Sequence, residues 1–171
     1  MLTNGDDGQF RQMIYDFFAL SSKLEVIRER FGARIGINGR QYSILIAVSH
    51  LQGNDGVGVN AVADHLHLSG AFVTTEVSRL IELGLVEKEV NPRDRRRVLL
   101  SVTPEGLARL NALVAYQAPV NDILFQCLDR NDFLALSRIL SELLECADNA
   151  QALQVYLDSE DAAARGRARR R

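Results

Sequence analysis

Hydrophobic and polar positions alternate with helical spacing along the N-terminal part of the chain. Between Gln9 and Phe31, apolar residues recur three or four positions apart, at Phe10, Met13, Ile14, Phe17, Leu24, Ile27 and Phe31. This period predicts one long amphipathic helix. Because one face of such a helix is apolar, the pattern also predicts a partner surface that covers it.

The next segments predict a core helix followed by two short helices. Residues 40–52, "RQYSILIAVSHLQ", are apolar around most of the helix circumference, and the turn-rich "GNDGVG" follows them. Asn60 is then expected to cap a helix from Ala61 to His65, and Ser69 to cap another that ends near Leu83, before Gly84. Two short helices joined by a tight turn predict a helix-turn-helix.

Two short β-branched segments come next. "LVEKEV" and "RVLLSV" flank a polar loop, so we expect a β-hairpin. Thr103 is expected to cap the following helix, which has Pro104 at its first position and ends near Leu128. A last helix begins at Asp129 or Asn131, and the segment beyond Leu157 is small, charged and expected to be disordered.

Together these elements predict a mainly α fold with a small β-hairpin. Residues 38–103 form a winged helix-turn-helix, residues 9–31 and 104–157 form helical segments around it, and residues 158–171 form a basic tail. Hydrophobic residues make up 47% of the 171 residues and charged residues 25%, as in ordinary globular proteins. With no apolar run of membrane-spanning length and no signal peptide, the chain is expected to be cytoplasmic. Cys127 and Cys146 fall in apolar helical patterns and are predicted to be buried, reduced thiols.

Charge is concentrated in one loop. The formal net charge is only −2, yet "NPRDRRRV" places four arginines around a single aspartate. A basic loop of this kind is often just a solvated turn. Since it follows a helix-turn-helix, however, it is favourably placed to reach a DNA minor groove. The second helix of that motif, which Ser69 is expected to cap, would be the recognition helix in the adjacent major groove.

The predicted DNA contacts lie on two elements. Hydroxyl, apolar and basic side chains that could face outward on the recognition helix are Ser69, Ala71, Phe72, Thr74, Thr75, Ser78 and Arg79. The hairpin tip contributes Arg93, Asp94, Arg95, Arg96 and Arg97, and Asp94 could orient one arginine through a bidentate pair. The alternative is a winged helix that docks proteins and does not recognise DNA sequence.

The segment "NPRDRRRVLLSVTPEG" resembles the wing of the MarR (multiple antibiotic resistance regulator) family. Its pattern of Asp, Arg, an aliphatic residue, Thr and Gly is met here by Asp94, Arg96, Val102, Thr103 and Gly106. The resemblance implies a homodimer joined through residues 9–31 and 104–157, which binds a pseudo-palindromic operator in double-stranded DNA as a repressor. It also implies that Arg96 enters the minor groove with Asp94 orienting it. Thr75 departs from the family pattern, because relatives often carry a basic residue there.

The resemblance further implies a small-molecule effector, such as an aromatic acid or its thioester, between the terminal helices and the winged helix. The side chains expected there are Phe17, Phe18, Arg40, Tyr42, Ile46, His50 and Tyr116, although an aromatic stripe at helical spacing is more often core. We expect no cofactor and no metal, because His65 and His67 lack further ligands. No catalytic motif is recognisable, so the chain is not expected to be an enzyme.

Overall fold

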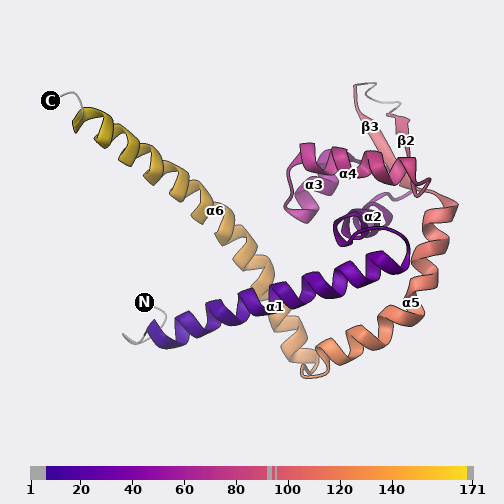
Figure 1. Cartoon of the computed structure of the whole chain (residues 1–171), viewed down its shortest axis with the longest axis horizontal. Helices are drawn as coiled ribbons and strands as arrows, with labels where there is room; N and C mark the ends of the chain where they lie inside the picture. The colour runs from indigo at the N-terminus through magenta and orange to yellow at the C-terminus, as the bar shows by residue number, and fades with distance from the viewer. Residues whose placement is uncertain (1–6, 92–93, 95, 169–171) are drawn as a thin grey trace. The chain divides into compact units, whose positions relative to one another are not determined.

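The computed structural model describes residues 7–91, 94 and 96–168, with the backbone alone from residue 161 on. The elements are α1 (Asp7–Arg34), α2 (Gly39–Leu51), β1 (Val57–Gly58), α3 (Val59–Leu66), α4 (Gly70–Glu82), β2 (Val86–Val90), β3 (Val98–Val102), α5 (Pro104–Phe125) and α6 (Arg130–Ala168) (Figure 1). The predicted class, mainly α with a small β component, is confirmed. The chain divides into two compact units, one ending at Pro119 and one beginning at Val120.

The core of the first unit is built around α2, as predicted. Asn38 caps this helix in a reciprocal arrangement with Gln41, whose backbone amide donates to the Asn38 side chain at 2.9 Å. Helices α1, α3 and α4 and strand β3 all pack against α2. The fully buried apolar side chains of this core are Ile44, Leu45, Val48, Val62, Val73, Leu80, Leu85, Val86 and Leu100.

The helix-turn-helix forms with one of its two predicted caps. Ser69 caps α4, because its hydroxyl oxygen accepts the Phe72 amide at 3.2 Å. The prediction for Asn60 is wrong: α3 already begins at Val59, and its cap residue, Gly58, makes no side-chain bond. Gly58 belongs to β1 and pairs with Leu99, so the strand fixes the extended backbone from which α3 starts.

The sheet has one strand more than the predicted hairpin. Strands β2 and β3 pair antiparallel from Val86 opposite Val102 to Val90 opposite Val98, and β1 pairs with the other edge of β3. β1 contains only two residues, which is too short for an alternating pattern to show. The buried Val57 anchors it to the core. In Figure 1 the hairpin projects away from α1.

A compact junction joins the base of the hairpin to α5. The Thr103 amide donates to the Leu85 carbonyl at 3.0 Å, and its hydroxyl donates to the Gly84 carbonyl at 2.7 Å. The same hydroxyl oxygen accepts the Gly106 amide at 3.0 Å, so Thr103 is the cap that the sequence predicts. One side chain therefore fixes both the start of α5 and the end of the winged-helix domain.

Thr103→Ala should lower the free energy of unfolding by about 1 to 2 kcal/mol, because it removes the cap and the bond to Gly84 together. Chemical denaturation at a fixed protein concentration measures the change. Thr103→Ser retains the hydroxyl and should recover most of the loss. Equal destabilisation by both variants would instead assign the effect to the methyl group of the threonine.

The C-terminal part differs from the prediction in two respects. α6 continues to Ala168, so the structure describes residues 158–168 as helix where a disordered tail was predicted. Cys127 and Cys146 are exposed in the single chain and not buried. The start of α6 agrees with the sequence, since Asp129 accepts the Asp132 amide at 2.8 Å. No helix in the described part of the chain has the length and hydropathy that a membrane crossing requires.

Candidate nucleic-acid interface

Helix α4 has one buried, mainly apolar face and one exposed, polar face. Val73, Val77 and Leu80 are buried against the core. Of the predicted contact residues, Phe72 is half-buried, and the exposed ones are Ser69, Ala71, Thr74, Thr75, Ser78 and Arg79. The predicted set therefore lies together on the outward side of one helix.

The hydroxyl groups on this face bond to the helix itself. Thr74 donates to the Gly70 carbonyl at 2.8 Å, Thr75 to the Ala71 carbonyl at 3.1 Å, and Ser78 to the Thr74 carbonyl at 2.9 Å. Each oxygen keeps acceptor capacity, and each hydroxyl can rotate to donate elsewhere. The face is thus polar but uncharged along its first turns, and it gains a positive charge only at Arg79.

The positive charge of Arg79 is paired with a buried carboxylate, that of Glu76, which was not predicted from the sequence. Glu76 lies on the inner face of α4, accepts a hydrogen bond from Gln41 Nε2 at 3.0 Å, and pairs with Arg79 Nη1 at 2.8 Å. The available signal was its spacing, since Glu76 stands three residues after Val73 and four before Leu80. A charged residue within an apolar stripe calls for a buried partner.

The wing is the hairpin formed by β2 and β3 with the loop between them. Its loop places Asp94, Arg96 and Arg97 in defined positions, whereas Arg93 and Arg95 lie outside the described residues. Asp94 Oδ1 accepts the backbone amide of Arg96 at 3.1 Å, and its Oδ2 lies 3.3 Å from Arg97 Nε. The ion pair is therefore made by Arg97 through a single nitrogen, where the sequence predicted a bidentate pair and the family resemblance implied an orientation of Arg96. Asp94 acts on Arg96 through the backbone.

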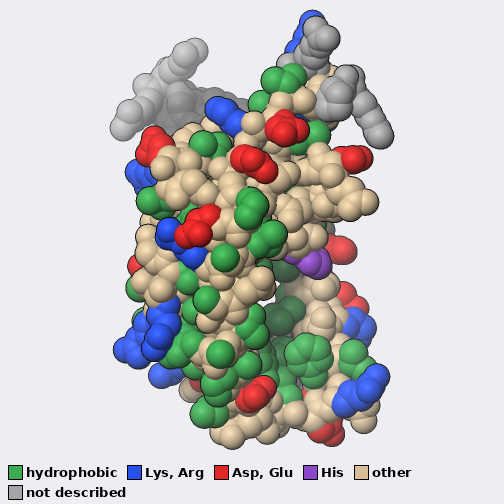
Figure 2. All heavy atoms as spheres, turned by 90° about the vertical axis from the view of Figure 1, so that its right-hand side faces the viewer, with side chains coloured by type: hydrophobic (Ala, Val, Ile, Leu, Met, Phe, Trp, Pro, Cys, Tyr) green, Lys and Arg blue, Asp and Glu red, His purple; other side chains and the backbone are tan. Residues whose placement is uncertain are grey.

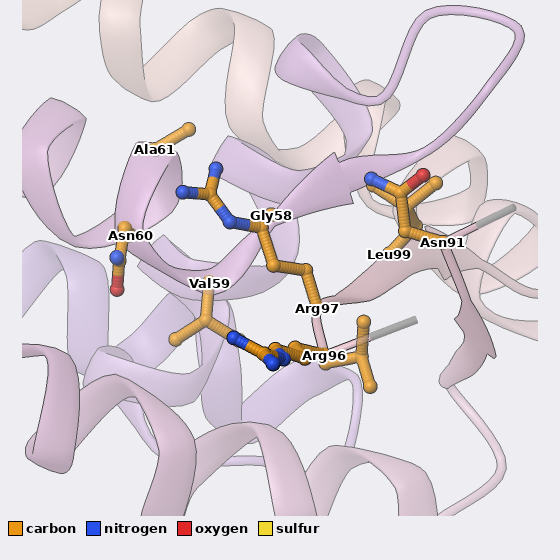
Figure 3. Close-up of a pocket in the computed structure, with 9 residues that line it drawn as sticks. Gly58, Val59, Asn60, Ala61, Asn91, Arg96, Arg97 and Leu99 are labelled. Atoms are coloured by element: carbon orange, nitrogen blue, oxygen red, sulfur yellow. The ribbon is translucent and has the colours of Figure 1, made fainter. Parts of the chain in front are cut away.

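A cavity of about 430 Å³ lies between the wing and the start of α3 (Figure 3). Its walls come from Gly58 to Ala61 on one side, and from Asn91 and residues 96–99 on the other. In Figure 3 the side chains of Arg96 and Arg97 extend from the wing toward the first turn of α3. Two guanidinium groups thus border a concave surface next to a helix N-terminus, a favourable environment for an anionic group.

The predicted effector residues fall into separate places. Tyr42 and Tyr116 both contact Phe31 edge-on, with ring centres 5.8 and 6.0 Å apart, and Gln117 donates to the Tyr42 hydroxyl at 2.9 Å. Burial raises the pKa of Tyr42 above its usual value, while the bond from Gln117 acts in the opposite direction. The structure thus brings these two tyrosines together in one aromatic cluster.

The other predicted effector residues lie away from that cluster. Arg40 stands over the ring of Phe72 at 5.4 Å, and both line a cavity of about 420 Å³ with Glu25, Arg28, Ser43, His67, Leu68 and Ser69. Phe17, Phe18 and Ile46 are exposed, and the His50 ring lies 5.9 Å from that of His65. Among the described side chains, no group of three or more His, Cys, Asp or Glu residues could hold a metal ion.

These elements define the class of protein. A core helix, a helix-turn-helix with a polar outward face, and an arginine-bearing hairpin that leads directly into a long helix together form a winged helix-turn-helix domain.

Comparison with known proteins gives a family match for the winged-helix region. The model of the MarR family matches residues 35–97. The resemblance to the MarR family that the wing predicts is confirmed over this region of the chain. Members of this family are transcription regulators and not enzymes.

A curated relative agrees with this match. A Thauera aromatica protein, named as a candidate transcriptional regulatory protein for the hcr operon, is 31% identical over 85 residues, or 48% of this chain and 49% of that protein. The chain thus spans about half the length of this relative.

Two of the structurally similar proteins were solved with DNA. The S. aureus MepR–DNA complex is 19% identical, with a TM-score of 0.66 over 77% of this chain and 93% of that one. A mutant of MarR from E. coli, complexed with operator DNA, is 18% identical, with a TM-score of 0.68 over 81% and 97%. At these identities the likeness shows a shared fold.

Proposed function

We propose that the protein is a homodimeric, sequence-specific DNA-binding transcription regulator that acts as a repressor. The observation that carries this proposal is that two candidate DNA-contact surfaces lie on one domain. The polar face of α4 bears the predicted base and phosphate contacts, and the wing carries Arg96 and Arg97 at the end of a short hairpin. This combination suits a helix in the major groove with a basic wing beside it.

The exposed apolar residues support the homodimer. Among its described side chains, α6 buries none in the single chain, although it carries the predicted apolar stripe, and α1 buries only Phe31 and Gly32 near its end. Figure 2 shows hydrophobic side chains exposed on one face of the molecule. Long amphipathic helices are stabilised mainly by packing, so these helices favour a partner, and a second copy of the chain offers the same surfaces.

Release by a small-molecule effector is the finer part of the proposal. The aromatic cluster of Phe31, Tyr42 and Tyr116 lies where α1, α2 and α5 meet, and the cavity beside Arg40 touches Ser69 and Phe72 of the recognition helix. A ligand at either place could move α4 relative to α1. An organic acid would suit the second cavity, since Arg28 and Arg40 both line it.

The proposal is tested by fluorescence anisotropy of the full chain against the DNA that flanks its own gene, with a scrambled duplex as control. We expect selective binding whose affinity falls by about one log unit per neutralised phosphate for each tenfold rise in salt. Duplexes from a random pool enriched on the protein extend the test to distant operators. Equal affinity for all duplexes would favour the protein-docking alternative.

A further inference from the structure

Glu76 places a carboxylate on the buried face of α4. Its residue is only 5% exposed, on the face of α4 that otherwise carries Val73, Val77 and Leu80. Burying a carboxylate is unfavourable unless both oxygens find partners, and an apolar side chain at this position would pack without that cost. Here Oε2 accepts from Gln41 Nε2 at 3.0 Å, and Oε1 pairs with Arg79 Nη1 at 2.8 Å.

Gln41 is itself held in one orientation. Its Oε1 accepts the Asn38 amide at 3.2 Å, so its amide nitrogen is the atom left to face Glu76. Its own backbone amide donates to Asn38 Oδ1 at 2.9 Å, and the backbone amide of Gly39 donates to Glu29 Oε2 of α1 at 2.6 Å. The support for Glu76 is thus attached to the junction of α1 and α2, where Ile35, Ile37 and Gly39 are buried.

Arg79 joins this buried support to the outward surface of α4. Its side chain is 55% exposed, and the pair with Glu76 uses one of its five N–H donors. The remaining donors can address two acceptors at once, such as the O6 and N7 atoms of a guanine or two phosphate oxygens. A free arginine on a helix surface samples many rotamers, and ordering it on binding costs conformational entropy.

We propose that Glu76 and Gln41 are positioning residues for DNA recognition: through the chain Asn38–Gln41–Glu76–Arg79, they hold the Arg79 guanidinium in the orientation in which it contacts DNA. This inference rests on the proposed function. It assigns the buried carboxylate a role in affinity and specificity in addition to its place in the fold. It also ties the orientation of Arg79 to the α1–α2 junction, so that a shift of that junction alters the DNA contact.

The test is a double-mutant cycle in the full 171-residue chain, on the duplex that the anisotropy experiment selects. The four proteins are wild type, Glu76→Gln, Arg79→Ala and the double variant. Removing a negative charge from the DNA-binding domain should by itself strengthen DNA binding. We expect the opposite for Glu76→Gln, a loss of about three- to tenfold, because Arg79 is released. In the Arg79→Ala background the same substitution should cause no further loss.

Glu82→Gln is the matched control, since it removes the same charge from an exposed position on the same helix. Thermal unfolding of each variant separates stability from DNA affinity. Equal loss of affinity from Glu76→Gln in both Arg79 backgrounds, or no loss in either, overturns the inference. If Glu76→Gln fails to fold, Gln41→Met replaces it in the same cycle. Wild-type protein that binds no duplex selectively overturns the proposed function itself.

Competition among duplexes with single base-pair changes identifies what Arg79 contacts. A guanine contact predicts that Glu76→Gln and Arg79→Ala lose discrimination at one and the same base pair. A phosphate contact predicts a uniform loss across all duplexes, with a lower salt slope for Arg79→Ala. Loss of discrimination by the two variants at different base pairs contradicts the inference.

Discussion

Gly106→Ala should destabilise the winged-helix unit by about 3 kcal/mol. A β-carbon at this buried position would overlap the Leu85 carbonyl oxygen and would lie 2.7 Å from a methyl group of Val102. The carbonyl cannot withdraw, because it accepts the Thr103 amide at 3.0 Å. In an open helix the same substitution would be stabilising by about 1 kcal/mol, so the clash reverses the sign expected from helix propensity.

Gly70→Ala is the matched control for this measurement. Gly70 is the first residue of α4, and a β-carbon there would meet only Asn60 Oδ1, at an ordinary 3.6 Å. Chemical denaturation at one fixed protein concentration compares the two variants, since the stability of an oligomer depends on concentration. A Gly106→Ala variant as stable as Gly70→Ala would show that α5 does not approach Leu85 as closely as described.

The sequence predicts most of the fold because its elements are local. The periodicity of α1 and α2, the Ser69 and Thr103 caps and the β-branched strands of the hairpin are each encoded within a few residues. β1 is not, because two residues carry no pattern and their strand forms only when Leu99 and Leu100 pair with them. The same holds for the start of α3, which β1 determines in place of Asn60.

The candidate site likewise contains some features that local sequence predicts and others that depend on contacts between distant residues. An exposed face can be predicted from helical spacing, and α4 presents its contact residues as expected. The roles of Glu76 and Gln41 could not be predicted, because their hydrogen bond joins residues 35 positions apart. Likewise, Asp94 pairs with Arg97, and its effect on Arg96 runs through the backbone, a choice that depends on the turn geometry. For the predicted effector residues, spacing placed Tyr42, Ile46 and His50 on one face, but the packing buries only the first.

Arg96→Ala should weaken binding to the selected operator duplex by about 1 to 3 kcal/mol and reduce the salt slope by about one. Arg96 is exposed at the end of the wing, and no described carboxylate forms an ion pair with it, so its charge is available to a polyanion. Arg97 shares its charge with Asp94 at 3.3 Å, so Arg97→Ala should cost less than Arg96→Ala.

Arg138→Ala supplies the control for net charge, because it removes an exposed arginine from α6, where it pairs with Glu142. It should change operator affinity little, and sedimentation should give the same oligomeric state for all three variants. If Arg96→Ala and Arg138→Ala weakened binding equally, the effect would be due to the net charge of the protein and its long-range electrostatic field. A loss confined to Arg96, with the oligomeric state unchanged, would assign DNA contact to the wing, since only a local contact can distinguish two arginines of equal charge.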